Sequence, residues 1–145
     1  MNMKKKFSLY LVALTLTFMI PLTTNSQEET IANSCKDYFK APFIASGQPF
    51  KALLTGNEIA EFHTSFFAGT TYRVVACPAG ENNIIFSVYD KDRNLIFSNK
   101  NHDLSPFWDF NVMGSLDCIV EAQLDPTKST SGMAMIMVGF KANIK

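Results

Sequence analysis

The amino-acid sequence predicts an all-β protein, an antiparallel sandwich or barrel of about eight short strands with a short N-terminal helix or arm. Three observations lead to this fold class. Side chains in Glu61–Cys77 alternate between apolar and polar positions on either side of an Ala68-Gly69 turn, as in two strands that each bury one face. Short β-rich segments then recur between clusters of turn-forming residues. No helical periodicity appears after residue 42, which disfavours a parallel sheet with helical crossovers.

The segment before the first strand has the spacing of a short helix. In Glu28–Lys40, the side chains of Ile31, Cys35 and Phe39 fall on one face, and Pro42 prevents the helix from continuing. Ser46–Pro49 is predicted to be a turn. Besides the central pair, the predicted strands are Phe50–Thr55, Ile84–Tyr89, Leu95–Ser98, Phe107–Met113, Cys118–Leu124 and Met133–Phe140.

The N-terminus has the pattern of a secretory signal peptide. Three lysines, Lys4 to Lys6, precede the apolar run Phe7–Ile20, and Thr24 and Ser26 are small residues spaced two apart. Residues 1–26 are therefore predicted to be the signal peptide and residues 27–145 a single domain. The apolar run is shorter than the roughly 18 residues that a membrane helix needs, so no stable membrane span is expected after cleavage. The predicted location is periplasmic or secreted.

The net charge and the cysteine content argue against two classes of function, nucleic-acid binding and thiol catalysis. After cleavage, 10 basic and 13 acidic residues remain, and a mildly acidic domain without a basic stripe is a poor nucleic-acid binder. Cys35, Cys77 and Cys118 allow one disulfide and one free thiol, with three possible pairings. We favour Cys35–Cys118, which would join the N-terminal segment to the sheet, with Cys77–Cys118 as the alternative. The remaining cysteine is expected to be a small buried hydrophobe and not a catalytic thiol.

Two long runs carry a resemblance to a known class of domain. Leu54–Cys77 (LTGNEIAEFHTSFFAGTTYRVVAC) and Ile84–Asn99 (IIFSVYDKDRNLIFSN) resemble the small jelly-roll-like β-sandwiches, of the pre-peptidase C-terminal type, found at the ends of secreted bacterial peptidases. The closing segments WDFNV, DCIVEAQLD and SGMAMIMVGFK are similar to a family of small uncharacterised exported proteins of Bacteroidota. The resemblance implies an antiparallel jelly-roll-like β-sandwich, and it implies no particular activity.

One group of polar residues predicts a ligand site. Alternation in Phe107–Met113 places Trp108 and Phe110 on one face and Asp109 and Asn111 on the other. We expect Trp108 to be buried in the core, because a lone large aromatic side chain usually is. Asp109 and Asn111 would then face outward beside a polar loop and could bind a hydroxyl-rich ligand such as a glycan. The loop residues of this candidate site are Asn99, Asn101, His102 and Asp103, and the candidate contact loops are Cys77–Asn83 and Asn99–Pro106.

Other patterns that could bind metals favour structural roles. Asp90-x-Asp92-x-Asn94 imitates the start of a calcium loop, but Leu95 and Asn101 occupy the positions that need glycine and a bidentate acid. The pattern therefore predicts a turn in which side chains bond to their own backbone. Met133, Met135 and Met137 alternate on one strand face, which favours core packing over a copper site. No cofactor or metal is predicted.

These observations favour a non-catalytic binding or interaction module with a protein or glycan partner, as a monomer or weak dimer. One alternative is a small periplasmic hydrolase that uses His63 or His102, which would require the two imidazoles to meet a carboxylate in one cleft. A structural envelope protein that forms dimers is the other alternative, and it would need a large exposed apolar patch. No nucleophile motif or phosphate-binding glycine loop is present in the sequence.

Overall fold

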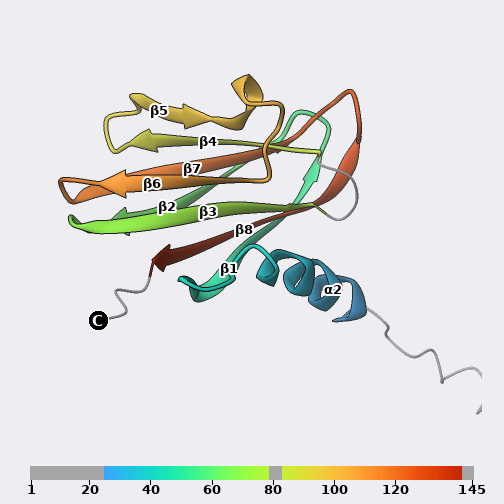
Figure 1. Ribbon diagram of the computed structural model, residues 1–145. Helices are drawn as coiled ribbons and strands as arrows, with labels where there is room; N and C mark the ends of the chain where they lie inside the picture. The colour runs from blue at the N-terminus through green and yellow to red at the C-terminus, as the bar shows by residue number, and fades with distance from the viewer. Residues whose placement is uncertain (1–24, 79–82, 142–145) are drawn as a thin grey trace, which may run out of the picture.

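Two stacked antiparallel sheets form the body of the computed structural model, which describes residues 25–78 and 83–141 (Figure 1). The predicted signal peptide lies almost entirely outside these residues, as does most of the candidate contact loop Cys77–Asn83. The described elements are α2 (Asn25–Lys36), β1 (Phe43–Thr55), β2 (Ile59–Phe66), β3 (Thr70–Pro78), β4 (Ile84–Asp90), β5 (Leu95–Ser98), the 3-10 turn η2 (Asn99–Asn101), β6 (Phe107–Val112), β7 (Leu116–Leu124) and β8 (Ser131–Lys141). The predicted all-β sandwich is confirmed.

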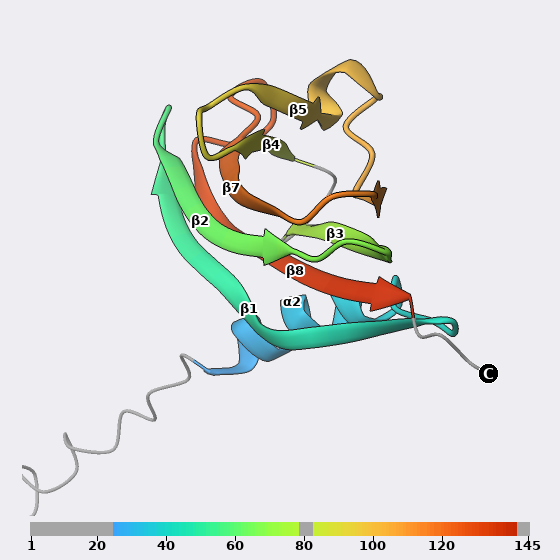
Figure 2. The same ribbon diagram turned by 90° about the vertical axis from the view of Figure 1, so that its left-hand side faces the viewer.

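The strand order is that of a jelly roll. One sheet has the order β1-β8-β3-β6 and the other β2-β7-β4-β5, and every described strand pair is antiparallel. Most consecutive strands therefore lie in different sheets, and only β4 and β5 form a hairpin within one sheet. The strand orders place β5 and β6 at one open edge of the two layers and β1 and β2 at the other, and Figure 2 shows β5 on a different side of the sandwich from β1 and β2.

The Ala68-Gly69 turn joins the two layers. Gly69 has a φ of 79°, a conformation that glycine adopts without a steric penalty, so the predicted turn is present. The strands on either side of it do not pair with each other, because β2 bonds to β7 while β3 bonds to β6 and β8. Alternation along a strand reports its buried face, but it does not report which neighbour the strand has.

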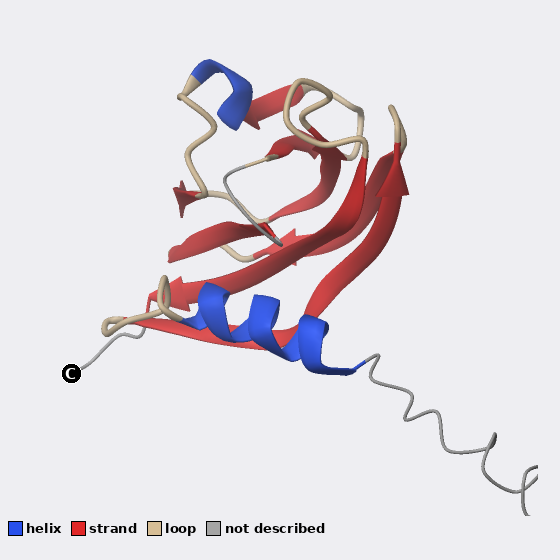
Figure 3. Ribbon diagram, turned by 90° about the vertical axis from the view of Figure 1, so that its right-hand side faces the viewer, coloured by secondary structure: helices blue, strands red, loops and turns tan. Residues whose placement is uncertain are grey.

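Helix α2 lies across the outer face of the sheet that contains β1 and β8 (Figure 3). Ile31 and Cys35 from the helix pack there against Val75, Met135 and Met137, which are all buried. The predicted packing role of the methionines is confirmed. The helix occupies Asn25–Lys36, whereas Glu28–Lys40 was predicted, because tight turns begin at its end, where the Tyr38 amide bonds to the Cys35 carbonyl at 3.1 Å.

The disulfide joins Cys35 to Cys77, with 5.5 Å between their Cα atoms, and Cys118 is free and buried. The predicted Cys35–Cys118 pair is wrong, and so is the alternative Cys77–Cys118. Cys77 has the same strand parity as Val75 and faces the helix on the outer side of its sheet. Cys118 belongs to the other sheet and points into the core between the layers, among residues such as Val88 and Val120. The bond does join the N-terminal segment to a sheet, as expected.

The main core lies between the two sheets. Its largest fully buried side chains include Phe66, Phe86, Leu124 and Ile136. Strand β1 is longer than predicted, since it begins at Phe43 and passes through the predicted Ser46–Pro49 turn as an irregularity in its register with β8. No helix among the described residues is long and apolar enough to cross a membrane.

Candidate functional site: the open edge between β5 and β6

The predicted ligand residue Asn99 is buried and has a structural role. Its side-chain oxygen accepts a hydrogen bond from the Phe86 amide at 2.9 Å. Both of its amide hydrogens are donated to backbone carbonyls, to Ile84 at 3.0 Å and to Ser105 at 3.1 Å. A side chain with no exposed surface cannot contact a ligand, so the prediction is wrong for this residue. Through these hydrogen bonds, Asn99 instead links the β5–β6 connection to β4.

Asp109 is exposed, as predicted, but its carboxylate is already paired. Arg73 donates to both of its oxygens, from Nε at 2.7 Å and from Nη2 at 2.8 Å. This is the cross-strand pair that neighbouring β3 and β6 bring into register. Asn111 is exposed two residues further along β6. Of the predicted glycan residues, Asn101, His102, Asp103 and Asn111 therefore remain open to a ligand.

Trp108 is not the core residue that the sequence predicted. Trp108 is 37% exposed. It lies at the open edge, where β6 pairs with β3 and has no other neighbour among the described strands. Its ring stacks on Phe97 of β5, with 4.6 Å between ring centroids, and lies equally close to His102. The three rings close one half of the gap between the two edge strands. The sequence pattern assigned Trp108 to the correct, inward face of β6. The pattern could not show that β6 is an edge strand, and the position at the edge is what exposes the ring.

The two histidines lie at opposite edges of one sheet. His63 is on β2, and His102 follows β5, while the strand order is β2-β7-β4-β5. Three strand spacings separate these edges, roughly 14 Å. This arrangement removes the shared two-imidazole site that the hydrolase hypothesis requires. Among the described residues, no group of three or more His, Cys, Asp or Glu side chains is arranged to hold a metal ion.

The other half of the open edge contains a cleft between the sheets, with a volume of about 430 Å³. Its inner wall comes from both layers, with Val88 and Cys118 on one side and Phe110 and Val112 on the other. We name this space the edge cleft, and the residues that line it are Phe66, Val88, Ile96, Asp109, Phe110, Asn111, Val112, Met113, Gly114, Leu116 and Cys118. Its size and mostly apolar lining are typical of a ligand site.

Exposed apolar side chains surround the mouth of the edge cleft. Met113, in the β6–β7 connection, is 86% exposed, and Ile96 of β5 is 45% exposed. Phe67, in the β2–β3 connection at the same end of the sandwich, is 63% exposed. Clustered apolar surface of this kind marks an interaction site more often than single exposed residues do.

Hydrogen bonds hold the two connections together. The Gly69 amide donates to the Val112 carbonyl at 2.8 Å, and the Ala68 amide donates to Ser115 Oγ at 2.9 Å. The Phe67 amide donates to the Tyr72 hydroxyl at 3.2 Å. The backbone beneath the exposed side chains is therefore fixed, which reduces the entropy that binding would cost.

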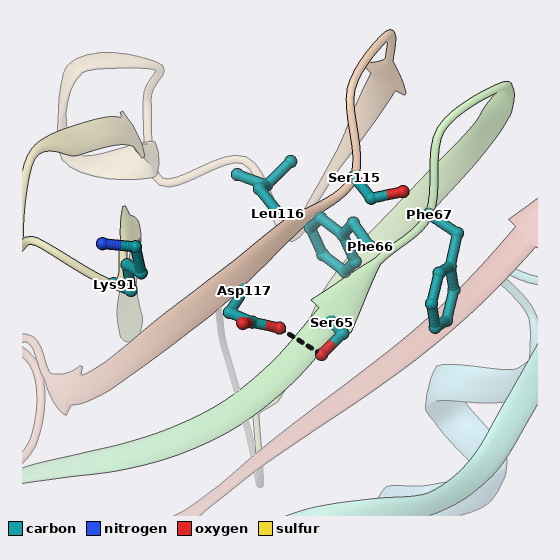
Figure 4. Close-up of a pocket in the computed structure, with 7 residues that line it drawn as sticks. All are labelled: Ser65, Phe66, Phe67, Lys91, Ser115, Leu116 and Asp117. Carbon is teal, nitrogen blue, oxygen red and sulfur yellow. Dashed lines mark hydrogen bonds between the residues drawn. The ribbon is translucent and has the colours of Figure 1, made fainter.

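A second pocket adjoins the edge cleft and shares Phe66 and Leu116 with it. Figure 4 shows this pocket, of about 320 Å³, with Ser65 and Asp117 joined by a hydrogen bond. We name it the Asp117 pocket, and its lining residues are Ser65, Phe66, Phe67, Lys91, Ser115, Leu116 and Asp117. Lys91 is placed by the turn that follows β4, where Asp90 accepts bonds from the amides of Asp92 and Asn94, as predicted for that motif.

Cys118 is a poor nucleophile despite its place in the edge cleft. Burial raises the pKa of its thiol to about 11, and the charges of Asp117 and Asp90 add to this effect. The thiol is therefore protonated at neutral pH, and a thiolate is the reactive form of cysteine. The edge cleft can hold an apolar group by burial, but this thiol is not set up to attack one.

Comparison with known proteins identifies no family. No family model and no curated protein matches the chain. Among solved structures, it is similar to Aeromonas hydrophila PliG, described as a periplasmic lysozyme inhibitor of g-type lysozyme. The identity is 15% and the TM-score 0.47, over 65% of this chain and 83% of that chain. A likeness at this level assigns no function, and the resemblance to peptidase C-terminal domains and to exported Bacteroidota proteins stays a prediction.

The edge cleft and the Asp117 pocket were not predicted from the sequence. Their walls come from β2, β4, β5, β6 and β7, which are brought together only by the jelly-roll order. One local signal was available, because Met113 directly precedes Gly114 and Phe67 lies two residues before Gly69, so both large apolar residues belong to tight connections. Apolar residues in tight connections are commonly exposed, since the chain there runs over the surface.

Proposed function

We propose that the chain is a non-catalytic binding module that acts outside the cytoplasm and holds an apolar segment of a partner protein in its edge cleft. The signal-like N-terminus and the Cys35–Cys77 disulfide support the location, because disulfides persist in oxidising compartments. The observation that carries the proposal is the edge cleft itself, with its apolar walls and the exposed side chains of Met113 and Ile96 at its mouth.

The chemistry of the edge cleft favours a protein partner over a glycan. Eight of its eleven lining residues are apolar or cysteine, and burial of a hydroxyl-rich sugar there would leave polar groups without hydrogen bonds. A volume of about 430 Å³ admits one or two large apolar side chains, which are the usual anchors of protein recognition. The burial of Asn99 and the ion pair between Asp109 and Arg73 also reduce the polar surface that a glycan could use.

A selection from a random peptide library tests this proposal. The bait is the protein purified after export from cells that express the full chain. Recovered peptides should contain large apolar residues and should bind at least tenfold more weakly to Met113→Asp and to Ile96→Asp. Leu53→Asp is the matched control, because Leu53 of β1 is also an exposed apolar residue, 72% exposed, and lies at the opposite edge strand of its sheet.

The outcomes separate the hypotheses. Loss of peptide binding in the Met113 and Ile96 variants, with retention in Leu53→Asp, supports the proposal. Equal binding to all three variants would overturn it. A parallel glycan array that gives specific binding sensitive to His102→Ala, but insensitive to Met113→Asp, would also overturn it in favour of the loop site.

A further inference from the structure

The Asp117 pocket has a charge that the surrounding residues do not neutralise. Asp117 Oδ1 accepts a hydrogen bond from the Ser65 hydroxyl at 2.6 Å, and the residue is exposed. No ion pair within the described ranges 25–78 and 83–141 includes Asp117. The second carboxylate oxygen therefore has no cationic partner from this part of the chain.

Lys91 lines the same pocket but is paired elsewhere. Its Nζ lies 2.8 Å from both carboxylate oxygens of Asp92, outside the pocket. Figure 4 shows its amino group directed away from Asp117. The hydrogen bond that Lys91 donates to Asp92 is the main cause that raises the pKa of Lys91, and the charges of Asp90 and Asp117 contribute to the same rise. The field at the pocket is thus negative even with Lys91 present.

The apolar residues that line the Asp117 pocket favour one kind of cation over another. Phe67 is an exposed aromatic residue, and Phe66 and Leu116 add apolar surface to the lining of the pocket. A guanidinium group pairs with a carboxylate through two parallel hydrogen bonds and stacks on an aromatic ring, whereas an ammonium group is more strongly hydrated and forms a point contact. The combination of one carboxylate and one exposed aromatic ring therefore favours a guanidinium over an ammonium group.

We propose that the Asp117 pocket receives an arginine side chain of the partner protein, whose guanidinium pairs with Asp117 and stacks on Phe67. This inference rests on the proposed function. Because the pocket shares Phe66 and Leu116 with the edge cleft, one segment of the partner can place an arginine and an apolar residue in the two sites side by side. The partner segment is then both basic and apolar, which complements an acidic domain.

A titration with two small probes tests the pocket directly. N-acetyl-arginine amide and the uncharged N-acetyl-citrulline amide have nearly the same shape, and binding is followed from the backbone amide signals of the isotope-labelled exported protein. The arginine probe should shift the signals of Ser65, Phe67 and Ser115 and saturate in the millimolar range. The citrulline probe should bind at least fivefold more weakly, and salt should weaken only the arginine probe.

Single substitutions then test whether Asp117 and Phe67 bind the arginine probe. Asp117→Asn keeps an oxygen that can accept the Ser65 proton, so the pocket retains its shape while the charge is removed. It should weaken the arginine probe at least fivefold, and Phe67→Ala should weaken it about two- to threefold. Glu29→Gln is the matched control, because it removes the same charge from an exposed residue on α2 and should leave binding unchanged.

The results distinguish failure of this inference from failure of the proposed function. Equal binding of arginine and citrulline probes, or unchanged binding in Asp117→Asn, would overturn the arginine pocket. Selected peptides that lose affinity for the Met113 and Ile96 variants but keep it for Asp117→Asn would also overturn the arginine pocket. That result would leave the proposed binding function of the edge cleft intact. The proposed function fails separately, when selected peptides do not respond to the Met113 and Ile96 variants.

Discussion

Replacement of Arg73 with methionine should destabilise the fold through several contacts at once. Arg73 pairs with both oxygens of Asp109, and its Nη1 donates to the Tyr38 carbonyl at 2.8 Å. Its guanidinium carbon lies 3.9 Å from the ring centroid of Phe43 and 4.4 Å from that of Phe107. The residue thereby links β3, β6, the start of β1 and the turn after α2.

The size of the effect follows from these contacts. The pair with Asp109 is partly exposed, so after solvent screening we assign it no more than about 1 kcal/mol. Loss of a hydrogen bond from a charged donor to the Tyr38 carbonyl costs about 1.5 kcal/mol. Stacking on two rings contributes roughly 1 kcal/mol. Arg73→Met should therefore lower the free energy of unfolding by about 3 kcal/mol, and Arg73→Lys by about 1 kcal/mol because a lysine cannot reproduce the planar stacking.

Urea unfolding followed by circular dichroism measures both changes. The double-mutant cycle of Arg73→Met with Asp109→Asn should show a coupling energy of about 1 kcal/mol. A loss below about 1 kcal/mol in Arg73→Met would refute the assignment of these contacts as stabilising, since the hydrogen bond to Tyr38 alone should exceed that value. Equal stability of Arg73→Lys and the wild type would refute the contribution of stacking.

Four further predictions follow from the same structure. Cys77→Ala should reduce the free energy of unfolding by about 4 kcal/mol, because the bond to Cys35 closes a loop of 42 residues, and the same loss should appear in wild type under reducing conditions. Cys118 should react with a thiol reagent at pH 8 only in denaturant; fast labelling of the folded protein would contradict its burial and raised pKa. Asn99→Leu should cost at least about 3 kcal/mol in urea unfolding, because two buried backbone groups and one partly buried group lose their partners. Hydrogen bonds from the side chain and backbone of Asn94 hold the pKa of Asp90 below its ordinary value, so the stabilisation is present above about pH 4 and is lost as the pH falls through the lower folded-state pKa. The difference in urea midpoint between wild type and Asp90→Ala should thus shrink from pH 6 to pH 2, and a constant difference would show that the carboxylate charge is not involved.

Local patterns predicted the elements of this fold well. The alternation in Ile84–Asp90 and in β8 identified strands, and Gly69 identified a turn, because backbone geometry and burial act on neighbouring residues. The Asp90 turn was also predicted, since its hydrogen bonds span only four residues. Most errors at strand ends were small and occurred where polar residues continue the pairing, as at Ser131, but β1 begins at Phe43 and not at the predicted Phe50.

The candidate site could not be derived in the same way. Trp108 is exposed because β6 is an edge strand, and Asn99 is buried because its amide reaches the backbone of β4. Both facts depend on which strands become neighbours, and the disulfide error has the same origin. Cys77 and Cys118 each lie on a correctly predicted strand, but the faces they occupy belong to different layers. Sequence periodicity specifies a face of one strand and leaves the arrangement of strands open.

The pairing of β1 with β8 determines when the molecule can fold. Among the described strands, β8 is the only hydrogen-bonded neighbour of β1, and Phe43 lies opposite Lys141. During synthesis, β1 therefore has no described strand to pair with until β8 is available, and contacts so distant in sequence form slowly.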